Sequence, residues 1–403
     1  MRVGVIGSGV SGLSAAWGLS SEHDVTVLES SDRPGGHAWT VDVDGEPVDL
    51  GFMVFNTVTY PELCRLFEQL GIQSRETCMS FSVRSSDARL EYQGSSLGGY
   101  FARRRSMCTL RHWRMLFGIL RFNRIATKSL GESGDRAEGT FGEWCAANRI
   151  GRDVRVRFLQ PIGSSMWSCS TAEFVLRFMS NHRMLQIGGR PTWRTVLGGS
   201  RSYVEAMANA GRFDLQCGRS VQSVHRCSEG VRVECAGGSS MQFDHVVLAC
   251  HADQSLDLVH DADPVEREVL SSIPYTSNDV VLHRDESLLP VRDRARASWN
   301  YLLSEDGQAA TITYDLRRLQ GLRNAEPVLL TLNGSGQIDP DRVLQRHVMH
   351  HPAYGSGTMK AQARHVELID RNGLSYCGAY WGWGFHEDGC ASGLRVSEAL
   401  NES

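Results

Sequence analysis

The chain is almost without lysine. Among its 403 residues only Lys128 and Lys360 are lysines, so nearly all of the 42 basic residues are arginines. No apolar run reaches the roughly 18 residues that span a bilayer, which predicts no transmembrane segment. The 11 cysteines form no C-x-x-C pair and no regular framework, so we expect reduced thiols in a cytoplasmic protein. A formal net charge of −4 gives no basic footprint for nucleic acid.

Three further features are missing. His251, His283, His350 and His351 have no second cluster at metal-ligand spacing, so they are interpreted as core or surface residues and no metal site is predicted. The first residues enter an apolar strand directly, so no signal peptide is expected. A second strand–GxGxxG–helix unit is also absent, which argues against a reductase with two dinucleotide domains.

A glycine-rich turn at the start of the chain is the first positive signal. An apolar strand leads into the run Gly7-Ser-Gly9-Val10-Ser11-Gly12. Gly7 permits a tight turn, Gly9 lets the backbone approach a pyrophosphate, and Gly12 lets the following helix pack on the strand. Val10 and Ser11 begin that helix, whose dipole and free N–H groups face the phosphates. A second strand over residues 24–28 ends at Glu29, whose carboxylate can accept both ribose hydroxyls of an adenosine.

The residues after Glu29 indicate which dinucleotide is bound. They run Arg33-Pro-Gly35-Gly36-His37-Ala-Trp-Thr, then a glycine at 45 and Asp-Leu-Gly at 49–51. This stretch resembles the flavin-containing amine oxidase superfamily, which includes monoamine oxidases, phytoene desaturases and fatty-acid isomerases. The family pattern reads R-x-G-G-R-x-x-T, a glycine and D-x-G, so His37 stands where the family carries its second arginine. The resemblance implies one non-covalent FAD, with the paired glycines at the pyrophosphate and ribityl chain.

Flavin-domain signals occur in three separate segments, which predicts an interrupted cofactor domain. We expect an α/β fold in which a discontinuous Rossmann-like FAD domain of the glutathione-reductase/GDI type comprises residues 1–55, 196–265 and 366–403. Residues 56–195 and 266–365 would form an inserted substrate domain with a mixed sheet and helices. The strands at 220–224 and 243–249 are expected to extend the dinucleotide sheet. By resemblance, the backbone of Val221 faces the adenine, and Gly378 lies in the flavin loop.

The C-terminal run Gly384-Phe385-His386-Glu387-Asp388-Gly389 adds a mechanism. It resembles the G-Y-M-E segment of the amine oxidases, with Phe385 in place of the cage tyrosine. A helix is expected to start near Glu387 or Asp388, with Asp388 as its cap. Its dipole would stabilise negative charge on the reduced flavin. The reacting centre is then predicted between flavin N5 and two segments, Phe52-Met53 and Phe385-His386. His386 is the candidate for proton transfer because its ordinary pKa lies near neutrality; a role limited to hydrogen bonding is the alternative.

The substrate is predicted from what the superfamily requires. Amine oxidation there usually involves a lysine beneath flavin N5, and this chain has none between residues 129 and 359. Over nearly its whole length the chain resembles bacterial and plant amine-oxidase-like proteins, whose plant members precede a cyclopropane-fatty-acid synthase domain. The specific strings are those at 49–56, 158–168, 193–203, 298–301 and 376–389. The resemblance implies hydride transfer from a fatty-acyl chain to flavin N5, as a desaturation or a double-bond isomerisation. Amine oxidation and a flavin-free, GDI-like lipid- or partner-binding module remain the alternatives.

Two further patterns agree with an apolar substrate. Aromatic residues are dense in the flavin-facing motifs: Phe52, Phe55, Trp167, Trp193, Trp299, Tyr301, Trp381 and Trp383. Residues 101–124 are basic and amphipathic, with Leu110, Trp113, Leu116, Phe117 and Leu120 on one helical face. Such a segment is typical either of a peripheral membrane helix or of a helix packed on a core. The electron acceptor and the oligomeric state are left open.

Overall fold

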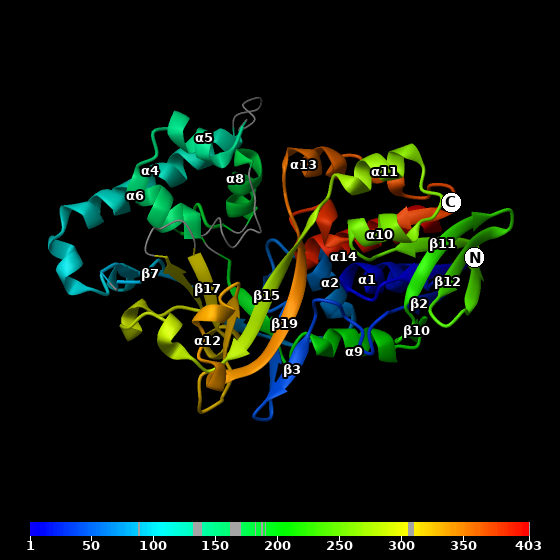
Figure 1. Cartoon of the computed structure of the whole chain (residues 1–403), viewed down its shortest axis with the longest axis horizontal. Coiled ribbons are helices and arrows are strands. Elements are labelled where there is room, and N and C mark those ends of the chain that lie inside the picture. Colours follow the sequence, from blue (N-terminus) through cyan, green and yellow to red (C-terminus); the bar gives the residue numbers. More distant parts are fainter. Residues whose placement is uncertain are drawn as a thin grey trace.

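A parallel sheet built from three distant parts of the chain organises one half of the molecule (Figure 1). The computed structural model describes residues 1–87, 89–131, 139–161, 171–181, 183–186, 188–189, 191–304 and 310–402. Trp167 and most of the 158–168 string therefore lie outside the described residues. The strand order is β10-β2-β1-β14-β20, with β1 Arg2–Ile6, β2 Asp24–Leu28, β10 Asp214–Gln216, β14 His245–Leu248 and β20 Leu374–Tyr376. The predicted α/β fold class is confirmed, whereas the domain boundaries remain a prediction.

Two helices pack tightly beneath the glycine-rich turn. Helix α1 (Val10–Leu19) starts directly after Gly9, and α14 (His386–Asn401) lies against it. The approach is close because a Cβ on Gly393 would lie 2.2 Å from the carbonyl oxygen of Ser11. Only glycine permits this distance, so Gly393 fixes how the C-terminal helix meets the cofactor end of α1.

One sheet prediction is wrong. Strand β11 (Val221–Cys227), expected to extend the dinucleotide sheet, pairs instead with β12 (Gly230–Cys235), which pairs in turn with β13 (Ser240–Phe243). The short β11–β12 connection favours antiparallel pairing of these neighbours, so they form a separate three-stranded sheet. The place beside β2 is taken by β10, a three-residue strand that the sequence pattern did not indicate.

A seven-stranded sheet forms the framework of the other half, with the order β19-β15-β18-β17-β16-β7-β8. Its strands are β7 Phe81–Ser85, β8 Glu91–Gln93, β15 Tyr275–His283, β16 Trp299–Leu303, β17 Ala310–Asp315, β18 Leu329–Leu332 and β19 Val343–Pro352. Figure 1 shows a group of helices at the end of the molecule remote from the parallel sheet. These are α4 Leu110–Gly131, α5 Phe141–Ala147, α6 Arg152–Val154 and α8 Ala172–Asn181.

Smaller elements join the two halves. The strands are β3 Thr40–Val43 with β4 Glu46–Asp49, and β5 Phe55–Asn56 and β6 Ser74–Thr77 on either side of β9 Trp193–Val196. The remaining helices are α2 Pro61–Gln69, α3 Leu97–Tyr100, α9 Arg201–Asn209, α10 Ala252–Leu258, α11 Pro264–Ser271, α12 Leu316–Gln320 and α13 Ser356–Gln362. Within the described ranges, no helix combines the length and apolarity needed to cross a bilayer.

Candidate cofactor and substrate site

A cavity of about 530 Å³ opens between the parallel sheet and the seven-stranded sheet. One wall consists of the loops after β1, β2, β14 and β20, that is, the carboxyl ends of the parallel strands. Ligands of open α/β sheets bind at this edge. The opposite wall comes from strands β15 to β19 of the second sheet. The cavity volume lies in the usual range for small-molecule sites.

The three glycines of the first loop do different things. A Cβ on Gly7, whose φ is +101°, would lie 3.1 Å from the carbonyl oxygen of Ala249, and one on Gly12 would lie 2.0 Å from that of Gly7. A Cβ on Gly9 would meet nothing within 4 Å, because Gly9 faces the cavity. Gly7 and Gly12 therefore close the turn, while Gly9 leaves room for a ligand at the N-terminus of α1.

Hydrogen bonds fix the Glu29 carboxylate in a position where it can accept further hydrogen bonds. The side chain is 8% exposed, and Ser8 donates to its Oε2 from the backbone N–H at 2.9 Å and from Oγ at 2.6 Å. Ser31 N–H donates to Oε1 at 2.9 Å. Burial alone would raise the pKa of Glu29, but the hydrogen bonds from Ser8 and Ser31 outweigh it and hold the pKa below its ordinary value. Glu29 is thus an ionised carboxylate at the position expected for the ribose.

The Gly35-Gly36 loop docks directly on the first glycine loop. Gly35 N–H donates to the carbonyl oxygen of Ser8 at 3.0 Å, and both Gly35 and Gly36 have positive φ values, +107° and +55°. Arg33 lies over the ring of Trp39 at 4.1 Å and donates to the carbonyl oxygen of Gly36. The loop therefore brings one permanent cation and a set of backbone N–H groups to the cavity.

His37 provides a test of whether FAD fits. Its Nε2 is buried without a hydrogen-bond partner among the described residues, although His37 lines the cavity. Its ring lies 5.3 Å from that of His351 and 6.5 Å from that of His251. Burial, followed by the charges of His251 and Arg33, lowers the pKa of His37 to about 4. The unpartnered Nε2 is left for a polar group of a ligand, and the Arg33 guanidinium with the open face of Gly9 fits an acceptor-rich diphosphate.

Three of the histidines in the sequence analysis lie at this cavity, and His350 is at the same time an exposed residue. His251, His350 and His351, expected as core or surface residues, line the cavity. They come from the loop after β14 and from the end of β19, so only the packing of the two sheets brings them together. His283 is a core residue as expected, with its Nε2 at 2.7 Å from Thr331 Oγ1.

His386 is fixed between two aromatic residues. Its ring stacks on Phe52 at 3.9 Å with an interplanar angle of 9°, and its Nε2 lies 2.9 Å from the hydroxyl of Tyr203. Burial, and then the charge of His37, lowers the pKa of His386 to about 3. The proposed proton-transfer role used the ordinary pKa of histidine, whereas burial keeps the His386 imidazole neutral at physiological pH; the role itself stays a prediction. Phe52, Met53, Phe385 and His386 all line the cavity, as predicted for the reacting centre.

The acids that follow His386 serve the fold. Helix α14 begins at His386, one residue before the expected start, and Asp388 accepts a hydrogen bond from the Phe385 N–H at 2.9 Å from inside the first turn. Burial raises the pKa of Asp388 to about 7. Glu387 accepts from the N–H groups of Glu62 and Leu63, both at 3.0 Å, and so caps helix α2. Neither acid is among the residues that line the cavity, and their assignment as cofactor ligands stays a prediction.

The remaining predicted residues divide between lining and supporting positions. Gly378 lines the cavity, and its N–H donates to Ser392 Oγ at 3.0 Å. Val221 does not line the cavity; it lies at the start of β11, two residues after Arg219, whose N–H donates to the carbonyl oxygen of Glu29. Predicted cofactor residues that line the cavity are Gly7, Gly9, Val10, Ser11, Glu29, Arg33, Gly36, His37, Gly378 and His386, whereas Gly12 and Gly35 support the loops from outside it.

The wall opposite the glycine loops is rich in apolar and aromatic side chains. The seven-stranded sheet contributes Trp299, Tyr314, Leu332 and Met349, and neighbouring segments contribute Met53, Met79, Trp193 and Leu319. Among the described lining residues Glu29 is the one carboxylate, and it belongs to the adenosine end. Of the other aromatic residues singled out, Phe55, Tyr301 and Trp381 belong to hydrophobic cores, and Trp383 packs on Phe174. Sequence reasoning missed Ser8, Trp39 and Tyr203, although Tyr203 ends one of the specific strings.

The fold and the cavity define a flavoprotein oxidoreductase that uses FAD. The profile of the family described as flavin containing amine oxidoreductase matches residues 10–287, and the chain belongs to this family. Coproporphyrinogen III oxidase of Mycobacterium bovis is 36% identical over 76 residues, which are 18% of this chain and 17% of that protein. The sequence match thus spans about a sixth of the length of these curated relatives.

Solved structures resemble the chain along its whole length. A triple mutant of putrescine oxidase gives a TM-score of 0.74 at 14% identity, covering 100% of this chain and 99% of the other. The CLA-producing fatty acid isomerase from P. acnes gives 0.73 at 15% identity, with coverage of 100% and 98%. Cyclohexylamine oxidase from Brevibacterium oxydans gives 0.71 at 17%, with the same coverage. At these identities the likeness establishes the fold.

Proposed function

We propose that the protein is an FAD-dependent oxidoreductase that removes hydride from an apolar, fatty-acyl substrate. The observation that carries the proposal is the chemistry of the cavity wall opposite the glycine loops. Among the described residues this wall has no acid that could pair with a substrate ammonium group and no lysine. An alkyl chain requires neither group, and its burial against methionine, tryptophan and leucine side chains is favourable by about 25 cal/mol per Å².

The residues of the chain would bind and orient the reactants. FAD, when bound, supplies a hydride acceptor. Arg33 and the N-terminus of α1 would hold the diphosphate, His37 would contact the cofactor beside them, and Glu29 would hold the adenosine ribose. Phe52 and His386 would form a stacked platform beside the reacting carbon, kept in place by the Tyr203 hydroxyl. A neutral His386 would orient the substrate and accept a hydrogen bond, but it has no acidic proton to donate at neutral pH.

Both desaturation and redox-neutral isomerisation agree with this site. The fatty acid isomerase of similar fold supports including isomerisation, in which hydride removal starts the reaction. An oxidation would leave reduced flavin for an external acceptor, whereas an isomerisation returns the hydride to the same chain. Product analysis under anaerobic conditions distinguishes the two, because only isomerisation turns over repeatedly without an acceptor.

Contact with a membrane surface through residues 101–124 is part of this proposal. Helix α4 packs on the core through one stripe, which includes His112, Met115, Phe122 and Ala126. A second apolar stripe faces outward: Leu110 is 73% exposed, Phe117 62%, and Trp113 and Leu120 are a little over one-third exposed. The helix thus has both of the faces that the sequence left as alternatives, and the outward one suits insertion among lipid headgroups.

Anaerobic bleaching of the flavin tests the proposed substrate class. The FAD-loaded protein is mixed with fatty acids in detergent, with phospholipids, and with small amines such as putrescine or cyclohexylamine. We expect bleaching, or double-bond migration, with fatty-acyl compounds alone. Bleaching by amines with no effect of any acyl compound would overturn the proposal in favour of amine oxidation.

A further inference from the structure

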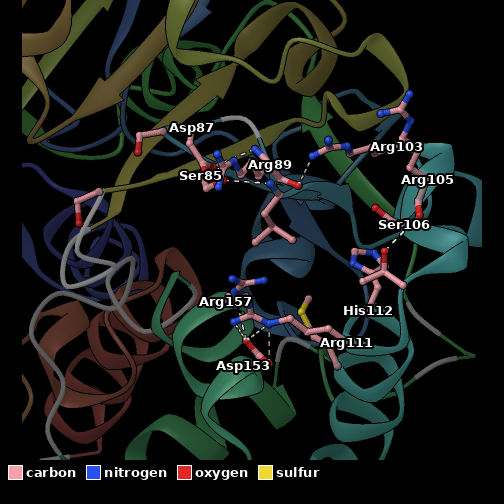
Figure 2. Close-up of a pocket in the computed structure, with 15 residues that line it drawn as sticks. Ser85, Asp87, Arg89, Arg103, Arg105, Ser106, Arg111, His112, Asp153 and Arg157 are labelled. Atoms are coloured by element: carbon pink, nitrogen blue, oxygen red, sulfur yellow. Dashed lines mark hydrogen bonds and ion pairs between the residues drawn. The ribbon is translucent and has the colours of Figure 1, made fainter.

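A second pocket, of about 690 Å³, lies at the helical end of the molecule and shares no lining residue with the cofactor cavity. It is enclosed by the β7–β8 connection, the 3-10 helix η1 (Arg104–Cys108), the start of α4, and the segment from α6 to the following π-helical turn η2 (Arg155–Leu159). Five arginines line it: Arg89, Arg103, Arg105, Arg111 and Arg157. Figure 2 shows Arg89 and Arg103 on one side, with Arg111, Arg157 and Asp153 on the opposite side.

The positive charge of this pocket is only partly neutralised by the described residues. Asp87 and Asp153 are the two carboxylates among the described lining residues. Asp153 serves two cations, since it accepts from Arg111 at 2.6 Å and lies 3.4 Å from Arg157 Nε. Asp87 lies 3.4 Å from Arg89. Five guanidinium groups against two carboxylates leave three positive charges facing one concave space.

Arg103 and Arg105 carry most of this excess. Neither forms an ion pair within the described ranges; Arg103 instead donates to the carbonyl oxygen of Arg89 at 2.7 Å. An arginine held by a neutral carbonyl keeps its charge available for an anion. Guanidinium groups that converge from two sides match the several acceptor oxygens of a phosphate group better than a single carboxylate.

Arg157 is positioned by an unusual piece of backbone. It lies in the π-helical turn Arg155–Leu159, a geometry that is rare and frequently occurs at functional sites. Its carbonyl oxygen accepts from the buried hydroxyl of Tyr92 at 2.7 Å, which ties the turn to β8. Burial, and next the charge of Arg111, lowers the pKa of Arg157, so an anion bound between the two guanidinium groups would relieve their repulsion.

The pocket and the outward apolar stripe of α4 meet at the start of this helix. Ser106 and Thr109 line the pocket, and each is followed by an exposed apolar residue, Met107 and Leu110. His112 and Met115 of the pocket wall belong instead to the face of α4 that packs on the core. A lipid molecule offers both complementary surfaces, a phosphate for the arginines and acyl chains for the stripe. A soluble phosphate compound would use only the first.

We infer that this pocket is a binding site for the phosphate headgroup of an anionic phospholipid, which seats the α4 stripe in a membrane surface. The inference rests on the proposed function, because an enzyme that acts on fatty-acyl chains would find its substrate in a membrane. The inference deepens that function by assigning the membrane contact to the arginines of this pocket, and not to the overall positive charge of residues 101–124.

Matched charge variants test the inference on the FAD-loaded protein. The pocket pair is Arg103→Gln with Arg105→Gln. The control pair is Arg104→Gln with Arg155→Gln, which removes the same charge from η1 and η2, two segments that enclose the pocket, without touching the pocket lining. Far-UV circular dichroism and thermal unfolding verify that all variants fold.

Titration with sn-glycerol 3-phosphate and sedimentation with phosphatidylglycerol vesicles provide two arms. We expect saturable binding of the soluble phosphate by wild type and the control pair, weakened at least tenfold in the pocket pair. Vesicle partitioning of the pocket pair should fall by more than the roughly thirtyfold that loss of two surface arginines causes at about 1 kcal/mol each. The control pair should lose no more than that.

The remaining outcomes overturn the inference. Equal losses in the two pairs would mean that only diffuse charge attracts the membrane. Binding of glycerol phosphate without binding of vesicles would assign the pocket to a free phosphate compound. Binding of a polyglutamate peptide but of neither phosphate probe would indicate an acidic protein partner. Failure of the proposed function is seen separately, because bleaching by fatty acids in detergent requires no membrane.

Discussion

Substitution of Gly9 by alanine separates cofactor binding from folding. A Cβ at this position meets nothing within 4 Å, and the backbone, at φ −63° and ψ 175°, is ordinary for alanine. Two opposing effects act on stability. Alanine restricts the unfolded chain, which raises the free energy of unfolding by about 0.4–1 kcal/mol. Alanine is also a poorer N-cap than glycine, which lowers the free energy of unfolding by a similar amount. The free energy of unfolding of the apoprotein should therefore change by less than about 1 kcal/mol.

The same methyl group should weaken FAD binding strongly. It occupies the face through which the diphosphate approaches the N–H groups of α1. Loss of one hydrogen bond to a charged group costs about 1.5–3 kcal/mol, which corresponds to a roughly 10- to 150-fold higher dissociation constant. Gly12→Ala is the control with the opposite phenotype, because its Cβ would lie 2.0 Å from the carbonyl oxygen of Gly7 and must disturb the fold itself.

Two measurements on each variant decide the outcome. Thermal unfolding of the apoprotein reports stability, and titration of FAD by quenching of its fluorescence reports affinity. Gly9→Ala is expected to keep its melting temperature within a few degrees and lose affinity, whereas Gly12→Ala loses stability before any cofactor is added. Wild-type FAD affinity in Gly9→Ala would refute the placement of the diphosphate at this loop.

Three further outcomes follow from single groups. Glu29→Gln should lose most of its FAD, measured as the flavin absorbance retained after desalting. In wild type the pKa of Glu29 is lowered in the folded state, so its contribution to the free energy of unfolding is present above pH 4.5 and is lost as the pH falls through the folded-state pKa. Asp388 has the opposite sign: its pKa rises from 3.8 to about 7, so stability declines as the pH increases across that interval, and Asp388→Asn should remove this slope from denaturant titrations. Because His386 stays neutral, the pH profile of turnover should have the same pKa values in His386→Gln as in wild type. The turnover rate should fall, because the contact with Tyr203 is lost. An ionisation near neutrality that disappears in the variant would show that His386 is a proton donor after all.

The cofactor end of the molecule was predictable because its geometry is local. Gly7, Gly9 and Gly12 lie within one turn, and the carboxylate of Glu29 reaches them across two adjacent strands. Positive φ at Gly7 and the close approach at Gly12 are demands that only glycine meets, so the residues themselves indicate the backbone path. A dinucleotide follows from such a path, whereas FAD in particular came from the resemblance of residues 33–51 to the flavin-containing amine oxidase superfamily.

The substrate end depended on packing between segments far apart in the chain. His386 meets Tyr203, 183 residues away, and stacks on Phe52. Its burial, and then the charge of His37, lower a pKa that the residue type alone places near neutrality. Glu387 resembled a flavin ligand in the sequence but caps α2, because α14 brings it against the N-terminus of that helix. Burial and partners are properties of the assembled chain, so no local pattern encodes them.

Helix α4 shows, within one element, which properties the sequence predicts and which depend on the tertiary structure. The sequence predicted an amphipathic stretch over residues 101–124 with apolar side chains at helical spacing, and the structure places the helix at residues 110–131. Two stripes satisfy that spacing, one through Met115 and Phe122 and one through Leu110 and Phe117, and periodicity is identical for both. Only the tertiary structure decided which stripe meets the core, because that depends on the shape of the surface the helix packs against. The stripe left outside, beside five arginines gathered from separate segments, is the feature that sequence alone could not assign.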